Sequence, residues 1–194
     1  MLIEAIILSL IIGLIRGGKF RRFKSVNHKT MWVLILGILI QYILVFLNKI
    51  EAIGKVNQII SHTKEIMIIS YILILIGIFT NLKFRSLWAA LLGYIMNFLV
   101  FSINNWKIPI LIEGIPFINS PKLEEIIETG STYLYTPITE GVKYPILGDI
   151  IVFAKPYPIS RIISLGDLII SFSIFALIQE IMVGEDSFMG GYIL

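Results

Sequence analysis

Five blocks of apolar residues constrain this chain most strongly. They cover residues 2–16, 30–48, 66–80, 87–104 and 164–183. A membrane-spanning helix needs roughly 20 apolar residues, with a range of about 17–25, and only the first and third blocks are shorter. Only 15% of the 194 residues are charged, whereas soluble domains carry about 25%. The sequence therefore predicts an all-α integral membrane protein, a bundle of five transmembrane helices forming one membrane domain over residues 1–194.

The segment between the fourth and fifth blocks, residues 105–160, holds all seven prolines of the chain. Proline removes a backbone donor and interrupts helices, so we expect a looped, extended cap region on one side of the membrane. Within it, residues 120–130 predict one short helix, with Ser120 as its N-cap and Gly130 at its end. Residues 131–139 are extended in character. A second short helix, at the membrane interface, is expected between the second and third blocks.

Lysine and arginine set the expected orientation. Positive residues crowd the loop after the first block and recur in the loop after the third: Arg16, Lys19, Arg21, Arg22, Lys24 and Lys29, then Lys83 and Arg85. Cytoplasmic loops carry this excess. The charges follow the first apolar block, unlike those of a cleaved signal peptide. We therefore predict a retained first helix, an outside N-terminus, a cytoplasmic C-terminus and a location in the plasma membrane.

The composition excludes several classes of site. There is no cysteine, so disulfides, thiolate metal sites and cysteine nucleophiles are ruled out. His28 and His62 lie far apart, and no histidine spacing indicates a metal ion; neither metal nor cofactor is predicted. No charged residue stands at the centre of an apolar block, which argues against a proton-coupled pump or a voltage sensor.

The basic loop after the first block has two interpretations. Arg16, Lys19, Arg21, Arg22 and Lys24 can contact anionic lipid headgroups, each worth about 1 kcal/mol near the surface. Alternatively, they serve only as the anchor that fixes orientation. Nucleic-acid binding is not expected, because the loop is short and membrane-bound.

Several uncharged or interfacial residues are candidates for ligand binding. Gln41 and Asn97 stand in the middle of apolar blocks, where such groups commonly bond across helices or line a ligand pathway. Asn104, Asn105 and Lys107 follow the fourth block, where they can cap the helix or lie at the interface.

Two Gly-Asp pairs lie near the start of the last block, with Asp149 before the block and Asp167 at its beginning. Ser164 and Asp167 have the spacing of a capping box, which explains Asp167 without chemistry. Asp149 occupies an ordinary turn position. As a catalytic pair the two carboxylates would have to share a proton at close range. Arg161 can instead hold either one ionised, or join a ligand site.

These motifs resemble a family of small bacterial membrane proteins, domain-of-unknown-function family 5317. The resemblance rests on LIRGGKFRRF, NNWKIPI, LGDII and PISRIISLGDLI, and it covers essentially the whole chain. Where the family has Asn-Gly-Gly-Lys-Met-Pro, this chain has Asn-Asn-Trp-Lys-Ile-Pro at residues 104–109. The resemblance implies no activity. SLGD is also similar to the last catalytic motif of lipoprotein signal peptidase, whose other aspartate motif is absent here.

Three functions follow as hypotheses. The leading one is a non-enzymatic membrane protein that binds lipid or a partner protein. One form of this hypothesis makes the chain a subunit of a larger membrane assembly. The second is an intramembrane hydrolase using Asp149 and Asp167. The third is a small-molecule binding or transport component with Gln41 and Asn97 lining a cavity.

Overall fold

The computed structural model describes residues 1–26, 28–48, 55–118, 120–128, 130 and 132–187. The chain divides into two compact units. Unit 1 comprises Met1–Gly37, Ile72–Tyr94 and Gly166–Leu194, and unit 2 comprises Ile38–Tyr71 and Ile95–Leu165. Their union in one membrane domain stays a prediction.

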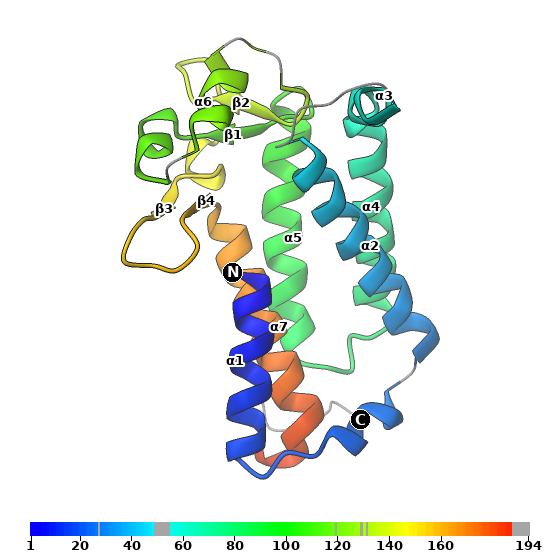
Figure 1. The fold of residues 1–194 in the computed structure, drawn as a ribbon. Helices are drawn as coiled ribbons and strands as arrows, with labels where there is room; N and C mark the ends of the chain where they lie inside the picture. The colour runs from blue at the N-terminus through cyan, green and yellow to red at the C-terminus, as the bar shows by residue number, and fades with distance from the viewer. Residues whose placement is uncertain (27, 49–54, 119, 129, 131, 188–194) are drawn as a thin grey trace. The chain divides into compact units, whose positions relative to one another are not determined.

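Helices form at all five apolar blocks, so the predicted helical class is confirmed (Figure 1). They are α1 (Leu2–Ile15), α2 (His28–Leu47), α4 (Thr63–Phe79), α5 (Ser86–Ile103) and α7 (Leu165–Val183). Among the described residues, three helices are long and apolar enough to cross a membrane: α2 from Lys29, α5 and α7. Helix α1 is apolar but shorter. A bundle of five spans therefore stays a prediction.

In unit 1, α1 and α7 run parallel to each other. The Ser9 hydroxyl donates to the carbonyl of Phe175 at 2.7 Å, and the Gln179 amide donates to the carbonyl of Ser9 at 2.6 Å. One turn further along α1, a Cβ on Gly13 would lie 2.8 Å from the sulfur of Met182. Small residues on α1 thus let the two helices approach closely.

Two further helical pairs of unit 1 run antiparallel. A Cβ on Gly93 of α5 would lie 2.7 Å from the carbonyl oxygen of Gly166, at the start of α7. The beginning of α5, at Ser86, instead meets Glu180 near the end of α7. In the pair of α2 and α4, a Cβ on Gly77 would lie 2.6 Å from the backbone of Leu34, and the hydroxyl of Thr30, earlier in α2, donates to the side-chain oxygen of Asn81, just after α4.

In unit 2 the Pro-rich region forms short strands. Strands β1 (Ile108–Ile110) and β2 (Tyr135–Pro137) pair in parallel, and β3 (Ile151–Phe153) pairs antiparallel with β4 (Arg161–Ile163). A bridge between Ile110 and Asp149 and a hydrogen bond from Ile150 to Ile163 connect the two ladders.

Short helices complete the described parts. They are η1 (Phe20–Ser25), α3 (Lys55–Ser61), η2 (Ile112–Ile118), α6 (Pro121–Glu128), η3 (Pro145–Leu147) and η4 (Gly184–Asp186). Helix α6 confirms the helix predicted between Ser120 and Gly130, and Gly130 has the left-handed φ of +67° that favours glycine after a helix. Helix α3 matches the predicted helix between the second and third blocks. Strand β2 lies within the stretch expected to be extended, whereas the β3–β4 hairpin was not foreseen.

Candidate functional site

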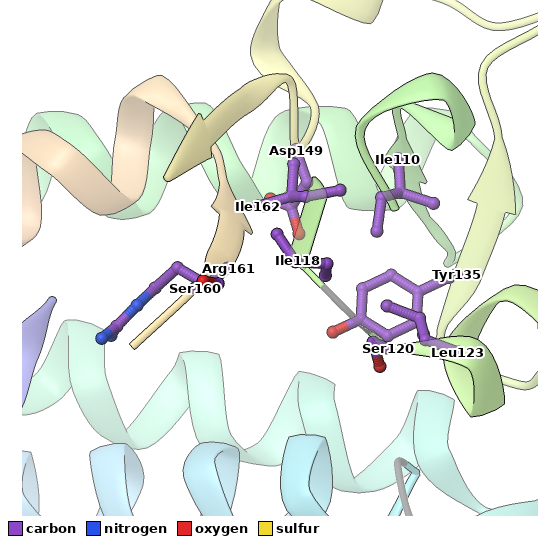
Figure 2. A pocket seen from close by; sticks show the side chains of 9 residues that line it. All are labelled: Ile110, Ile118, Ser120, Leu123, Tyr135, Asp149, Ser160, Arg161 and Ile162. Atoms are coloured by element: carbon purple, nitrogen blue, oxygen red, sulfur yellow. The ribbon is translucent and has the colours of Figure 1, made fainter. Parts of the chain in front are cut away.

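A pocket of about 180 Å³ lies entirely within unit 2 (Figure 2). Its lining combines one carboxylate, one guanidinium residue and hydroxyl groups with aliphatic side chains. The residues are Ile110, Ile118, Ser120, Leu123, Tyr135, Asp149, Ser160, Arg161 and Ile162. Two of the residues singled out from the sequence, Asp149 and Arg161, therefore line one pocket.

Asp149 is fixed in the pocket wall by its backbone. Its N–H donates to the carbonyl of Pro109 at 2.7 Å, and its carbonyl accepts from the N–H of Leu111 at 2.9 Å. The preceding Gly148 allows this pairing, because a Cβ there would lie 2.6 Å from the oxygen of Pro109. The residue is 8% exposed, so the carboxylate has little contact with bulk water.

The register of the strands brings Tyr135 and Asp149 to the same face. Tyr135 is opposite Ile108, and Asp149 is bridged to Ile110 on the other edge of β1. Directly opposed residues share a face of a sheet, as do residues two apart along one strand. Tyr135, Ile110 and Asp149 consequently point to one side of β1, and that side is the floor of the pocket.

Residues around the start of α6 close the pocket from a second direction. The carbonyl of Ser120 accepts from the N–H groups of Leu123 and Glu124, which places Ser120 at the N-cap position directly before α6. Leu123 is buried on the inner side of α6, and Ile118 at the end of η2 adds a further aliphatic wall. Figure 2 shows these side chains beside the ring of Tyr135.

Arg161 lines the pocket from β4, but its guanidinium group points out of the pocket. Its Nε donates to the carbonyl of Ile159 at 3.1 Å, and its guanidinium carbon lies 5.7 Å from the ring centre of Tyr157. Figure 2 shows the guanidinium directed away from the Asp149 carboxylate. Partial burial lowers the pKa of Arg161 from its ordinary value, yet an arginine remains protonated in proteins.

The two aspartates of the sequence belong to different units. Asp167 lies in the first turn of α7 in unit 1, and it is not among the described residues that line the pocket around Asp149. Ser164 directly precedes α7, as expected of an N-cap, and its hydroxyl donates to the Asn97 side-chain oxygen at 2.9 Å. A catalytic pair of Asp149 and Asp167 stays a hypothesis.

The residues after α5 hold loops in place. The Asn104 amide donates to the carbonyls of Val100 and Lys143, and its oxygen accepts from the N–H of Lys143. The Lys107 ammonium donates to the carbonyl of Thr132 at 2.9 Å. Asn97 bonds with Ser164, whereas Gln41 is half-buried on α2. A ligand-binding role for these residues stays a prediction, and three of them make structural contacts.

Asn105 and Trp106 adopt the left-handed backbone conformation, with φ of +56° and +60°. This conformation costs most residues about 1–2 kcal/mol, and glycine adopts it freely. It explains why a Gly-Gly pair suits these two positions in the resembling family. Here the indole of Trp106 packs on the rings of Phe98 and Phe101 and under the ammonium of Lys64.

A comparison with protein-family models shows to which family the chain belongs. The model of DUF5317, a family of unknown function, matches residues 25–179, which is most of the chain. The chain belongs to DUF5317. No curated protein and no solved structure matches it, which leaves the similarity to lipoprotein signal peptidase without support.

The five basic residues predicted to contact lipid, Arg16, Lys19, Arg21, Arg22 and Lys24, precede the range matched by the DUF5317 model and divide into two groups. Arg16 donates to the side chain of Gln179 and to the carbonyl of Asp186, and Arg22 donates to the carbonyls of Met182 and Val183. These two arginines therefore hold the C-terminal end of α7. The other three predicted lipid contacts, Lys19, Arg21 and Lys24, have exposed side chains on or beside η1.

Sequence reasoning missed two groups of polar residues in this DUF5317 member. Tyr135 reaches the pocket through strand register, for which a single position gives no signal. Ser120 was predicted as an N-cap, but not as a residue that lines a pocket. Glu180 and Gln179 are fully buried in unit 1. The Glu180 carboxylate accepts from the N–H groups of Arg85 and Ser86 and from the Ser86 hydroxyl. Glu180 is a charged residue inside an apolar block, and this feature of the sequence could have indicated a buried polar site.

Proposed function

We propose that this chain is a non-enzymatic integral membrane protein that binds anionic lipid headgroups at one end of unit 1. One observation carries the proposal: the basic residues of two separate loops gather at the C-terminal end of α7. Arg16 and Arg22 contact that end directly, and the N–H groups of Arg85 and Ser86 bind Glu180 there. The side chains of Lys19, Arg21, Lys24, Lys83 and Arg85 are exposed.

An exposed aromatic residue accompanies these charges. Phe20 is 55% exposed and stacks on Phe23 at 6.4 Å between ring centres. Aromatic rings beside lysine and arginine are typical of the membrane interface, where the ring enters the headgroup layer and the charges meet phosphate. The segment Lys19–Lys24 is thus suited to lie on an anionic lipid surface.

Helix directions favour the five-span arrangement that this proposal requires. The parallel pair α1 and α7, with α5 antiparallel to α7, is the pattern expected if the first and last helices cross in the same direction. The two basic loops then lie on one side of the membrane, which we assign to the cytoplasm of a bacterial plasma membrane. The N-terminus and the Pro-rich region are assigned to the outside. A C-terminal reporter that is active only outside the cell would contradict this topology if it gave a signal.

The lipid proposal is tested by thermal unfolding of the purified chain in nanodiscs. We expect phosphatidylglycerol in place of phosphatidylcholine to raise the melting temperature by several degrees at low salt. The variant Lys19→Gln/Lys24→Gln should lose at least half of that increase, because each basic residue near the surface contributes about 1 kcal/mol. Added salt should reduce the increase as well.

The matched control is Lys143→Gln/Lys155→Gln, which removes the same charge from exposed lysines of unit 2. It should keep the full response to phosphatidylglycerol. An equal loss in both double variants would mean that total charge, and not the segment at the end of α7, determines the response. Binding of a partner protein, alone or within a larger assembly, stays a prediction.

A further inference from the structure

The pocket of unit 2 brings a nearly buried carboxylate together with hydroxyl groups. Asp149, Tyr135, Ser120 and Ser160 are its polar members besides Arg161. Asp149 and Tyr135 are 8% and 5% exposed, and both come from backbone that is hydrogen-bonded to β1. Figure 2 shows the Asp149 carboxylate and the Tyr135 hydroxyl turned toward the centre of the pocket. The positions of these groups are therefore set before any ligand arrives.

The burial of Asp149 strengthens the attraction of its carboxylate for a cation. The residue is 8% exposed, and charges attract more strongly where contact with bulk water is limited. Ile110, Ile118, Leu123 and Ile162 complete the lining of the pocket. A carboxylate accepts hydrogen bonds only, and a hydroxyl both accepts and donates. A primary ammonium group offers three N–H donors and one positive charge, which complements one carboxylate and its neighbouring hydroxyls.

We propose that this pocket binds the primary ammonium group of a small ligand, with Asp149 as its counter-ion and Tyr135 as a second acceptor. This goes beyond lipid binding at the end of unit 1 and does not depend on it. The volume of about 180 Å³ compares with the cavity of about 150 Å³ that accommodates benzene in an engineered protein. An ammonium carrying two to four carbon atoms is of the right size.

Other cations fit the site less well. A divalent metal ion prefers several carboxylate ligands, and the part of the chain that the structure describes contains no cluster of three or more metal-binding side chains. A quaternary ammonium has no N–H donor and is recognised by several aromatic faces. Tyr135 is the single aromatic residue among the described residues that line this pocket.

Arg161 favours ligands in which an anionic group is attached to the ammonium-bearing carbon chain. Its guanidinium extends away from Asp149 (Figure 2) and lies over Tyr157, so an anionic group attached to the ammonium would meet it outside the pocket. A phosphate bonded to an ethanolamine group has this chemistry. The ammonium could therefore come from a free amine or from the ethanolamine headgroup of a lipid.

The first test is calorimetric titration of the purified full chain with ethylammonium chloride, with tetramethylammonium chloride as the probe that lacks N–H donors. We expect saturable binding of ethylammonium and none of tetramethylammonium. Asp149→Asn should weaken ethylammonium binding at least tenfold, and the exposed control Asp186→Asn should leave it unchanged. The proposal is overturned if wild-type chain shows no saturable binding, or if folded Asp149→Asn binds with unchanged affinity.

Tyr135→Phe keeps the test decisive if Asp149→Asn does not fold. This variant removes one hydroxyl and retains the ring, so we expect roughly ten- to hundredfold weaker binding, the range of one hydrogen bond to a charged group. Unchanged affinity in folded Tyr135→Phe would then count against the assigned site.

Nanodiscs distinguish the two sources of the ammonium group. If the ligand is a lipid headgroup, phosphatidylethanolamine raises the melting temperature relative to phosphatidylcholine, and Asp149→Asn abolishes the rise. If it is a free amine, ethylammonium raises the melting temperature in phosphatidylcholine and phosphatidylethanolamine has no effect. A rise with either probe that survives in folded Asp149→Asn contradicts the proposal.

Discussion

The two units use buried polar side chains in opposite ways. In unit 1, Gln179 and Glu180 are fully buried and bind groups on α1 and at the start of α5. In unit 2, Asp149 is almost as buried, but its carboxylate faces a pocket. Polar groups that close on protein partners fix helices, and polar groups that surround an opening can receive a ligand. Burial alone therefore does not indicate which of these residues has a role in binding.

The largest effect is expected from Glu180→Ala in unit 1. The substitution leaves two N–H groups and the Ser86 hydroxyl without their acceptor in a buried site, which should lower the free energy of unfolding by about 3 kcal/mol. Reversible unfolding in detergent micelles measures the change. Asp186→Ala, at an exposed neighbouring position, should change it by less than about 0.5 kcal/mol. Similar losses in both variants would contradict the role of Glu180.

Gly148→Ala tests the wall of the pocket in unit 2. A Cβ there would lie 2.6 Å from the backbone oxygen of Pro109, so we expect a loss of about 2 kcal/mol in unfolding free energy, together with weaker ethylammonium binding. A Cβ on Gly141, in contrast, would meet no atom within 4 Å. Gly141→Ala should therefore be neutral in both measurements, and equal behaviour of the two variants would show that the wall is not fixed as described.

Ser9→Ala gives a smaller effect on unit 1. It removes the hydroxyl that donates to Phe175 and lies 3.2 Å from the Gln179 amide nitrogen, while the Ser9 carbonyl still accepts from Gln179. We expect a loss of about 1–1.5 kcal/mol, because the hydroxyl takes part in two hydrogen bonds and the Gln179 amide keeps the Ser9 carbonyl as an acceptor. Thermal unfolding should show the decrease, and Ser102→Ala, whose exposed hydroxyl bonds within its own helix, serves as the control. A larger effect of Ser102→Ala would reverse the argument.

The smallest effect is a gain in unit 2 from Asn105→Gly. The exposed Asn105 has a φ of +56°, and glycine relieves that conformation, partly offset by the entropy it adds to the unfolded chain. We expect stabilisation between zero and about 1 kcal/mol, measured by thermal unfolding. Gly17→Asn is the reverse substitution at a comparable position, because Gly17 has a φ of +75° and open space around it. It should cause a small loss of stability where Asn105→Gly causes a gain. A clear loss from Asn105→Gly would mean that the asparagine side chain matters more than its backbone.

Local patterns predicted the helices well. Apolar blocks placed α2, α5 and α7, and the pair of Ser120 and Gly130 placed α6, because length and capping are properties of neighbouring residues. The pocket depends on pairing between Ile110 and Asp149 and between Ile108 and Tyr135. Such pairing joins distant residues, and a single sequence contains no local signal for it. For the same reason Asp149 and Arg161 were recognised as candidates, whereas Tyr135 and Ser120 were not.

The carboxylate that completes the start of α5 has a consequence for biosynthesis. The N–H groups of Arg85 and Ser86 bind Glu180, which the ribosome adds 95 residues after Arg85. Helices α4 and α5 are therefore made before Glu180, and the N–H groups at the start of α5 lack this acceptor until the last helix has been made. Unit 1 reaches its native hydrogen bonding only when synthesis has passed Glu180, so a chain that stops before this residue lacks more than its final helix.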